Sequence, residues 1–182
     1  MPKNIVLLSD GTGNSAGKLF RTNVWRLYQA LDLAQNNPDG TPAQIAYYHG
    51  GGGSSAFKPL AIIGGAFGWG LKRTVIDLYT YLCRNYRDGD RVYCFGFSRG
   101  AFTIRVLTGL INSKGLVEAD SEDKLRNLAT EAFNSYRLTY KTFIRLERPF
   151  RFARKVARGI AGFVKPKAPE AARRKPDLAF LG

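Results

Sequence analysis

Short apolar runs alternate with stretches of helical periodicity along most of the chain. The apolar runs predict strands over residues 4–8, 44–48 and 91–97. Apolar positions that share one helical face predict helices that begin near Asn23 and that cover residues 71–86, 101–111 and 123–146. This alternation is typical of an α/β fold, with a mostly parallel sheet and helices on both faces.

Glycine, asparagine and proline mark the expected connections between these elements. A cluster of Ser, Gly and Asn over residues 9–17 follows the first strand, and Asn23 is in position to cap the first helix. The run Asn-Asn-Pro-Asp-Gly at 36–40 is expected to end that helix. His49 and the glycines at 50–53 are expected to form a loop after the second strand.

The last part of the chain differs from the rest in composition. Residues 145–175 contain eleven Lys or Arg side chains against two acidic ones, and so carry most of the net charge of +14. Residues 177–181 begin a further apolar run with the pattern of a strand, and the chain stops at Gly182. We therefore expect residues 1–182 to form a single incomplete α/β domain with a basic insertion at about 145–176.

The positive charge favours anionic partners such as phospholipid surfaces, acidic proteins or nucleic acid. In a helix, one face of the basic segment would carry Arg145, Arg148, Arg151, Lys155 and Arg158. Such a helix can lie on an anionic membrane. The alternative is a solvated insertion without a partner. The charge is not accompanied by a nucleic-acid recognition motif.

Composition and the apolar segments also exclude several protein classes. Hydrophobic residues make up 45% of the chain and charged residues 23%, which excludes a disordered protein. Cys83 and Cys94 lie in apolar stretches and are interpreted as small buried hydrophobic residues, not as metal ligands or a disulfide framework. The N-terminus does not resemble a secretory signal, and no apolar run is long enough to span a bilayer. We therefore expect the chain to be cytoplasmic as made.

The candidate chemistry lies where the third strand meets the third helix. There the sequence contains Gly96-x-Ser98-x-Gly100, in the strand–turn–helix setting of the nucleophile of α/β-hydrolases. Such a nucleophile sits on a sharp, strained turn, and glycines two residues to either side avoid collisions with the neighbouring strand and helix. The motif predicts Ser98 as a nucleophile. The alternative is a Gly-Ser turn that only joins strand to helix.

A serine nucleophile also needs backbone donors for the oxyanion that forms during acyl transfer. The N–H of Arg99, the residue after the nucleophile, is the first candidate. The second usually comes from a loop after an earlier strand, and here Gly11 and Thr12 are the candidates. The alternative for this loop is a simple turn held by the side chains of Asp10 and Asn14.

The catalytic base is harder to find, because His49 is the only histidine in the chain. In α/β-hydrolases the acid and then the histidine follow the nucleophile along the chain. His49 precedes Ser98 and is therefore a poor candidate for the base. We expect the acid and the histidine to lie beyond Gly182.

The first loop also fits a different function. The spacing Gly11-x-Gly13-x-x-Ala16 after a strand matches a loose dinucleotide-binding fingerprint, so a Rossmann-like nucleotide-binding module is an alternative. However, the predicted helix begins near Asn23, which is too late for its N-terminus to meet a pyrophosphate.

Three motifs together resemble one known family. Residues 10–14 read Asp-Gly-Thr-Gly-Asn and resemble an Asp-Gly-Thr-x-Asn signature. Residues 47–50, Tyr-Tyr-His-Gly, resemble a Tyr-Tyr-Asp-Gly element, and residues 96–102 resemble a Gly-Phe-Ser-Arg-Gly-Ala element. In this order the set resembles the catalytic domain of the type VI secretion phospholipase effectors. Residues 180–182, Phe-Leu-Gly, resemble the start of the family strand that carries the catalytic Asp.

The resemblance implies a bacterial lipase or esterase that cleaves acyl esters of phospholipids through a Ser-Asp-His triad, without a metal or another cofactor. Ser98 carries over as the nucleophile, and the family's acid would follow just after Gly182. The resemblance also implies export by a type VI system. His49 stands where the family element has Asp, and residues 51–55 differ from the Val-Gly-Thr that follows it. A catalytically dead or truncated remnant of such a hydrolase is therefore the alternative.

Overall fold

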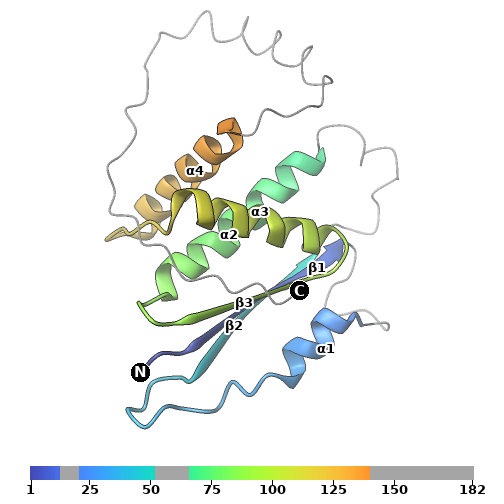
Figure 1. Ribbon diagram of the computed structural model, residues 1–182. Coiled ribbons are helices and arrows are strands. Elements are labelled where there is room, and N and C mark those ends of the chain that lie inside the picture. Colours follow the sequence, from blue (N-terminus) through green and yellow to red (C-terminus); the bar gives the residue numbers. More distant parts are fainter. Residues whose placement is uncertain (13–20, 52–65, 140–182) are drawn as a thin grey trace, which may run out of the picture.

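The computed structural model describes residues 1–12, 21–51 and 66–139 of the chain (Figure 1). The described elements, in chain order, are β1 (Asn4–Thr12), α1 (Asn23–Ala30), β2 (Gln44–Gly51), α2 (Ala66–Asn85), β3 (Arg91–Gly96), α3 (Arg99–Lys114) and α4 (Glu122–Thr139). The basic segment and the apolar run at 177–181 lie outside the described residues.

The three described strands form one parallel sheet in the order β2-β1-β3, so the first strand of the chain lies in the centre. Ser9 of β1 is the register partner of both His49 on β2 and Gly96 on β3. Since all three strands run in the same direction, the residues that follow β1 and β3 emerge at the same end of the sheet.

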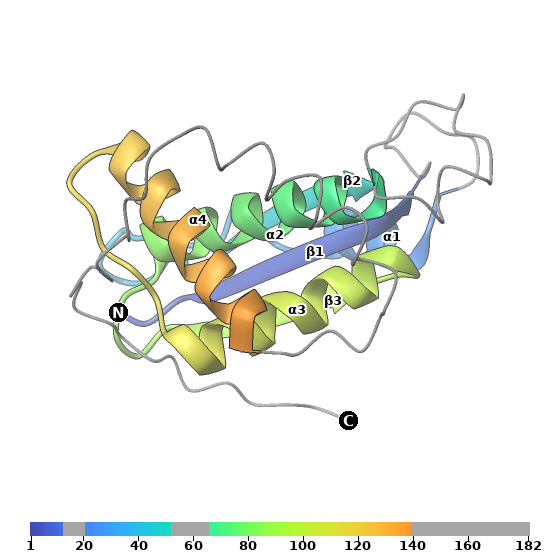
Figure 2. The same cartoon turned by 90° about the horizontal axis from the view of Figure 1, so that it is seen from above.

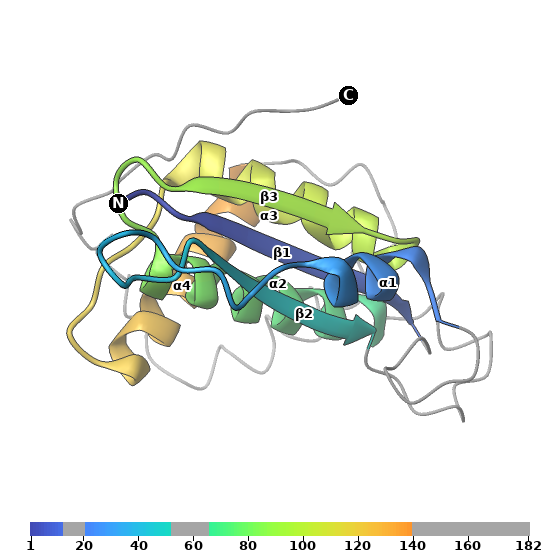
Figure 3. The same ribbon diagram turned by 90° about the horizontal axis from the view of Figure 1, so that it is seen from below.

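Helices cover both faces of this sheet. α2 and α3 pack on one face with α4 outside them, whereas α1 lies on the opposite face (Figures 2 and 3). Ile5 and Leu7 of β1 join the core under α2 and α3, and the alternate residues Val6 and Leu8 join a second core with α1. Burial on both faces explains the continuous apolar run of β1. The expected α/β class, with parallel strands and helices on both faces, is confirmed.

The first helix differs from its expected limits. Thr22 is the N-cap, because its Oγ1 accepts a hydrogen bond of 3.2 Å from the N–H of Trp25, and Asn23 is the first helical residue. The helix ends at Ala30, and the backbone of Leu31 is already extended. The expected stop at residues 36–40 instead forms a tight turn on the way to β2, closed by an isolated bridge between Asn36 and Pro42.

The second strand is longer than its apolar run. β2 continues through His49 to Gly51, so the expected loop at His49 and Gly50 is wrong. Pairing with β1 persists to Thr12, and the backbone ladder overrides the weak strand preference of glycine. α2 begins at Ala66, before the expected residue 71, and α3 begins at Arg99, directly after the turn that carries Ser98.

Candidate active site

Ser98 occupies the turn between the carboxyl end of β3 and the first residue of α3. β3 ends at Gly96, α3 begins at Arg99, and Ser98 is the N-cap of that helix. Its side chain makes no capping hydrogen bond, and the residue is exposed. The strand–turn–helix arrangement therefore presents a hydroxyl that is accessible and is not used to cap the helix.

The backbone of this turn is strained at Ser98. Its φ of 53° and ψ of −120° lie in a region that L side chains rarely adopt, and Ser98 is the only non-glycine residue with positive φ in the described part of the chain. Such a conformation costs roughly 1–3 kcal/mol and persists only where the surrounding structure imposes it. Backbone strain of this kind is frequent at active sites.

Two glycines allow the turn to pack closely. A Cβ on Gly96 would lie 2.6 Å from the Ala101 backbone nitrogen, and a Cβ on Gly100 would overlap the Ser9 carbonyl oxygen. The first turn of α3 therefore rests directly on the end of β1. No residue other than glycine fits at position 100 without separating the helix from the strand.

Backbone hydrogen bonds fasten the turn to the central strand. The Phe97 N–H donates to the Ser9 carbonyl over 3.1 Å, and the Gly100 N–H donates to the Phe97 carbonyl over 2.8 Å. The Ala101 N–H donates to the Ser98 carbonyl over 3.1 Å. Ser98 is therefore held at a fixed position relative to the end of β1.

The N-terminus of α3 offers a donor for a developing negative charge. The N–H of the first helical residue has no acceptor within its own helix, and the Arg99 N–H donates no hydrogen bond to another residue of the described ranges. The helix dipole adds a partial positive charge at the same point. An anion near Ser98 would therefore meet an unsatisfied donor.

A buried carboxylate holds together the segment that leaves β1. Asp10 Oδ1 accepts from the Gly11 N–H at 2.7 Å, and Oδ2 accepts from Thr22 Oγ1 at 2.5 Å and from the Tyr48 hydroxyl at 2.7 Å. Asp10 is 3% exposed. It therefore ties Gly11, which lies in β1 and not in the turn expected there, to Thr22, the N-cap of α1, and ties both to β2.

The end of β1 is also irregular where this carboxylate lies. Ser9 pairs with His49 and Thr12 pairs with Gly51, so β1 has one residue more than β2 in this interval. Such a bulge redirects side chains, and bulges are frequent beside active sites. The Gly11 N–H is already bonded to Asp10, and it would have to leave that carboxylate to serve as an oxyanion donor.

Tyr48, which donates to the Asp10 carboxylate, belongs to an aromatic cluster on the α1 face of the sheet. The Tyr48 ring lies 4.9 Å from the Trp25 ring and 5.4 Å from the Tyr28 ring, between ring centroids. The pKa of Tyr48 is raised above its ordinary value, mainly by burial and secondly by the hydrogen bond to Asp10. Tyr48 therefore remains a hydrogen-bond donor at any physiological pH. The sequence motif at 47–50 included Tyr48, but it did not indicate the hydrogen bond between Tyr48 and Asp10.

His49 lies on the other side of the central strand from Ser98. It belongs to β2, whereas Ser98 follows β3, and two strand spacings correspond to about 9–10 Å. The Nε2 atom of His49 is 3.5 Å from Thr74 Oγ1 on α2. Burial is the main cause that lowers the pKa of His49. The structure does not bring this imidazole together with Ser98.

Other chemistry has little support among the described residues. Cys83 and Cys94 are free thiols, and burial raises the pKa of each to about 12. No group of three or more His, Cys, Asp or Glu side chains that could hold a metal ion occurs in the described ranges. No helix within these ranges is long and apolar enough to cross a membrane. Asn14, the other expected partner in the first loop, lies outside them.

The strain at Ser98 leads to a testable difference between two variants. Both Ser98→Gly and Ser98→Ala remove the hydroxyl, but only glycine adopts the positive φ without cost. We expect Ser98→Gly to be more stable than Ser98→Ala by about 1–2 kcal/mol. Urea denaturation of the two proteins, followed by circular dichroism, measures this difference. Equal stabilities would contradict the strained turn.

Comparisons with known proteins relate the chain to a family and to a yeast protein. The family described as the catalytic domain of Tle1-like phospholipase effectors of type VI secretion matches residues 3–182. The uncharacterized protein YEL023C of Saccharomyces cerevisiae is 34% identical over 137 residues, which cover 68% of this chain and 19% of the yeast protein. The chain thus spans about a fifth of the length of this relative. No solved structure matches the chain.

Proposed function

Because the chain belongs to the family of Tle1-like type VI secretion phospholipase effector catalytic domains, we propose that it is part of a serine hydrolase of the lipase or esterase type, with Ser98 as its nucleophile. The observation that carries this proposal is the strained, exposed serine at the N-terminus of α3. A turn that only joins strand to helix gains nothing from a serine in this conformation, since glycine would fit there without strain.

In the proposed reaction, Ser98 Oγ attacks the acyl carbon of a phospholipid ester as a histidine base takes its proton. The oxyanion of the tetrahedral intermediate is stabilised by the Arg99 N–H and by a second donor from Gly11 or Thr12. The Gly11 N–H would have to leave Asp10 to serve, and Thr12 is the last residue of β1 and pairs with Gly51 of β2. The ester C–O bond then breaks, the leaving alcohol receives the proton, and water releases the fatty acid from Ser98.

We propose that the base and its orienting acid come from sequence that follows Gly182 in a longer α/β-hydrolase-like domain. Two facts support this view: the only histidine is on β2, and the chain matches 19% of its yeast relative. Under this proposal the basic insertion at about 145–176 precedes the strand that carries the acid, and a type VI system exports the protein. The second candidate function is that of a remnant of such a hydrolase without catalytic activity. The position of His49 on β2, away from Ser98, favours it.

Nucleotide binding is not proposed for the first loop. Gly11, the first glycine of the dinucleotide fingerprint, lies in β1 and not in the tight turn that the phosphate-binding loop needs, and its N–H donates to the buried Asp10 carboxylate. A carboxylate beside that amide would repel the phosphate. α1 also begins only at Asn23, several residues after Ala16.

The test is the reaction of the chain with a fluorophosphonate, followed by mass spectrometry of its peptides. An oxyanion hole alone retains roughly 10³–10⁴-fold rate enhancement over water when a triad member is missing. We therefore expect Ser98 to be modified well before Ser113, Ser121 and Ser135, which are also exposed. The reaction is run in mildly alkaline buffer, so that hydroxide takes the place of the absent histidine base. Modification of the four serines at equal rates would refute the nucleophile and favour the remnant.

A further inference from the structure

The end of the sheet that carries Ser98 is positively charged. The N-terminal halves of the helices that begin at this end, together with the residue before the cap of α1, supply Arg21, Arg26, Lys72, Arg73, Arg99 and Arg105, of which Arg73 is paired with Asp77. The one described acidic residue at the carboxyl ends of the strands is Asp10, which is buried and bonded to three donors. The surface around Ser98 therefore has a local excess of cations.

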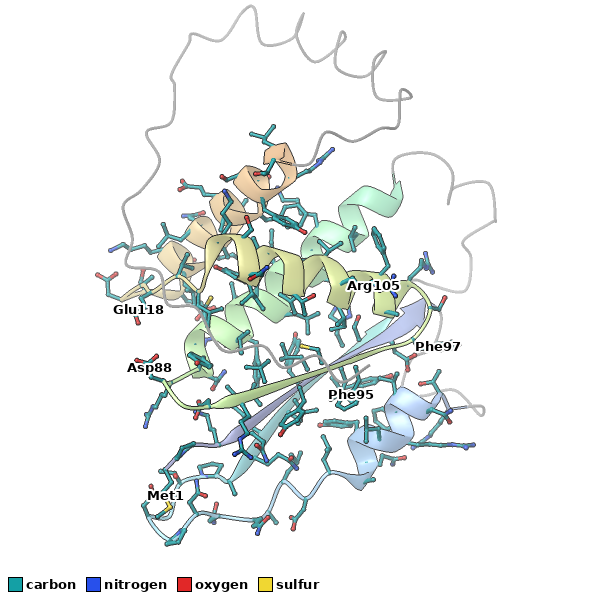
Figure 4. The ribbon with its side chains drawn as sticks, viewed as in Figure 1. Met1, Asp88, Phe95, Phe97, Arg105 and Glu118 are labelled. Carbon is teal, nitrogen blue, oxygen red and sulfur yellow. The ribbon has the colours of Figure 1, made fainter. Side chains whose placement is uncertain are left out.

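The opposite end of the sheet contains charges of both signs. Most ion pairs among the described residues lie there, including Lys3–Asp90, Arg84–Glu122 and Lys124–Asp120. In contrast, none of the ion pairs within the described ranges includes Arg21, Arg26, Arg99 or Arg105. Figure 4 shows the two ends, with Arg105 and Phe97 at one and Asp88, Glu118 and Met1 at the other. The charge therefore changes along the strand direction.

Exposed phenylalanines lie among these arginines. Phe95 is 40% exposed, Phe97 is 51% exposed and Phe102 is 47% exposed, and all three lie within four residues of Ser98. Arg105 is one helical turn after Phe102 on α3. Arginine side chains that surround exposed aromatic rings suit the interface between lipid headgroups and acyl chains.

We propose that this surface, consisting of Arg26, Arg99, Arg105, Phe95, Phe97 and Phe102, docks the protein on membranes of anionic phospholipid. The inference rests on the proposed function, because it supplies the orientation in which Ser98 faces its substrate. The arginines bind lipid phosphates, and the phenylalanines enter the acyl boundary beside the nucleophile. An anionic membrane fits this surface because the surface combines positive charge that no ion pair among the described residues neutralises with exposed apolar rings.

The orientation is tested with an environment-sensitive fluorophore at one of two positions in the full 182-residue chain. Phe97→Cys places the dye beside Ser98, and Asp88→Cys places it at the opposite end (Figure 4). Vesicles contain phosphatidylglycerol in phosphatidylcholine, or phosphatidylcholine alone. We expect a blue shift of the dye at position 97 with the anionic vesicles only, and no shift at position 88. Equal shifts at both positions, or a shift at position 88 alone, would overturn the proposal.

Charge variants separate this surface from the basic segment at 145–175, which stays intact in every protein. Removal of one protein arginine that lies at the surface of an anionic membrane weakens membrane binding about fivefold. Arg26→Gln with Arg105→Gln is thus expected to weaken vesicle binding roughly 25-fold. The matched control is Arg87→Gln with Arg91→Gln, which removes two exposed cations from the opposite end and should have little effect. Equal losses in both double variants would attribute binding to overall charge and refute the surface.

Two further outcomes are distinguishable. If duplex DNA shifts the dye at position 97 and anionic vesicles do not, the surface binds nucleic acid and the membrane proposal is wrong. The docking experiments do not require Ser98, so they can be repeated with Ser98→Ala. If position 97 enters the membrane but Ser98 resists the fluorophosphonate, the docking surface stands and the hydrolase proposal fails. The reverse result would refute only the docking surface.

Discussion

Purified alone, the 182-residue chain is expected to hydrolyse short-chain esters and phospholipid vesicles roughly 10⁴–10⁶-fold more slowly than a hydrolase with a complete triad. A serine hydroxyl without a base stays protonated at neutral pH and is a weak nucleophile. The only histidine is on β2, separated from Ser98 by the central strand, and its Nε2 lies beside Thr74. What remains is the catalysis due to the oxyanion donors and substrate binding.

The measurement is the rate of release of a chromogenic alcohol and of fatty acid, compared with Ser98→Ala and with His49→Gln. We expect His49→Gln to leave the residual rate unchanged. Rapid turnover that both substitutions abolish would contradict this prediction and would make His49 the base. Rapid turnover that survives Ser98→Ala would instead indicate another nucleophile or a contaminating esterase.

Gly100→Ala is expected to cause a large loss of stability. Its new methyl group would overlap the Ser9 carbonyl oxygen and lie 2.8 Å from the Asp10 carbonyl oxygen. These backbone atoms belong to the central strand and cannot rotate away, so α3 must move off the sheet. We expect a decrease of about 3 kcal/mol or more in the free energy of unfolding, as measured by urea denaturation.

A matched control for this change is Gly70→Ala on α2, where a Cβ would meet no atom within 4 Å. Alanine costs less backbone entropy in a helix than glycine, so this variant should be more stable than the parent by about 0.5–1 kcal/mol. A loss of stability at position 70, or none at position 100, would contradict the close approach of α3 to β1.

The main features of the fold could be predicted because the central strand is buried on both faces. The run of apolar residues in β1 and the periodicity of α2 and α3 each follow from burial, which the sequence reveals directly. The limits of β2 could not be predicted in this way. His49, Gly50 and Gly51 have little preference for a strand, and they are extended because β1 supplies a partner for their backbone.

The candidate site was only partly visible in the sequence. Gly96, Ser98 and Gly100 form a local motif between an apolar strand and a helical stretch, so their turn could be predicted from the spacing together with that setting. The bonds of Asp10 to Tyr48 and Thr22 join residues far apart in the chain and depend on strand register and the bulge. Strict alternation in the two parallel strands would have suggested that Asp10 and Tyr48 share a face, but not that one carboxylate receives three donors.

The strained backbone at Ser98 has a consequence for the history of the chain. A lineage that no longer needed a nucleophile would gain stability from any mutation that placed glycine at this position, and a single base change is enough for some serine codons. Drift would therefore erase the serine more readily than it would erase a serine in a relaxed conformation. A working nucleophile, as proposed for Ser98, would account for a serine kept at a φ of 53°.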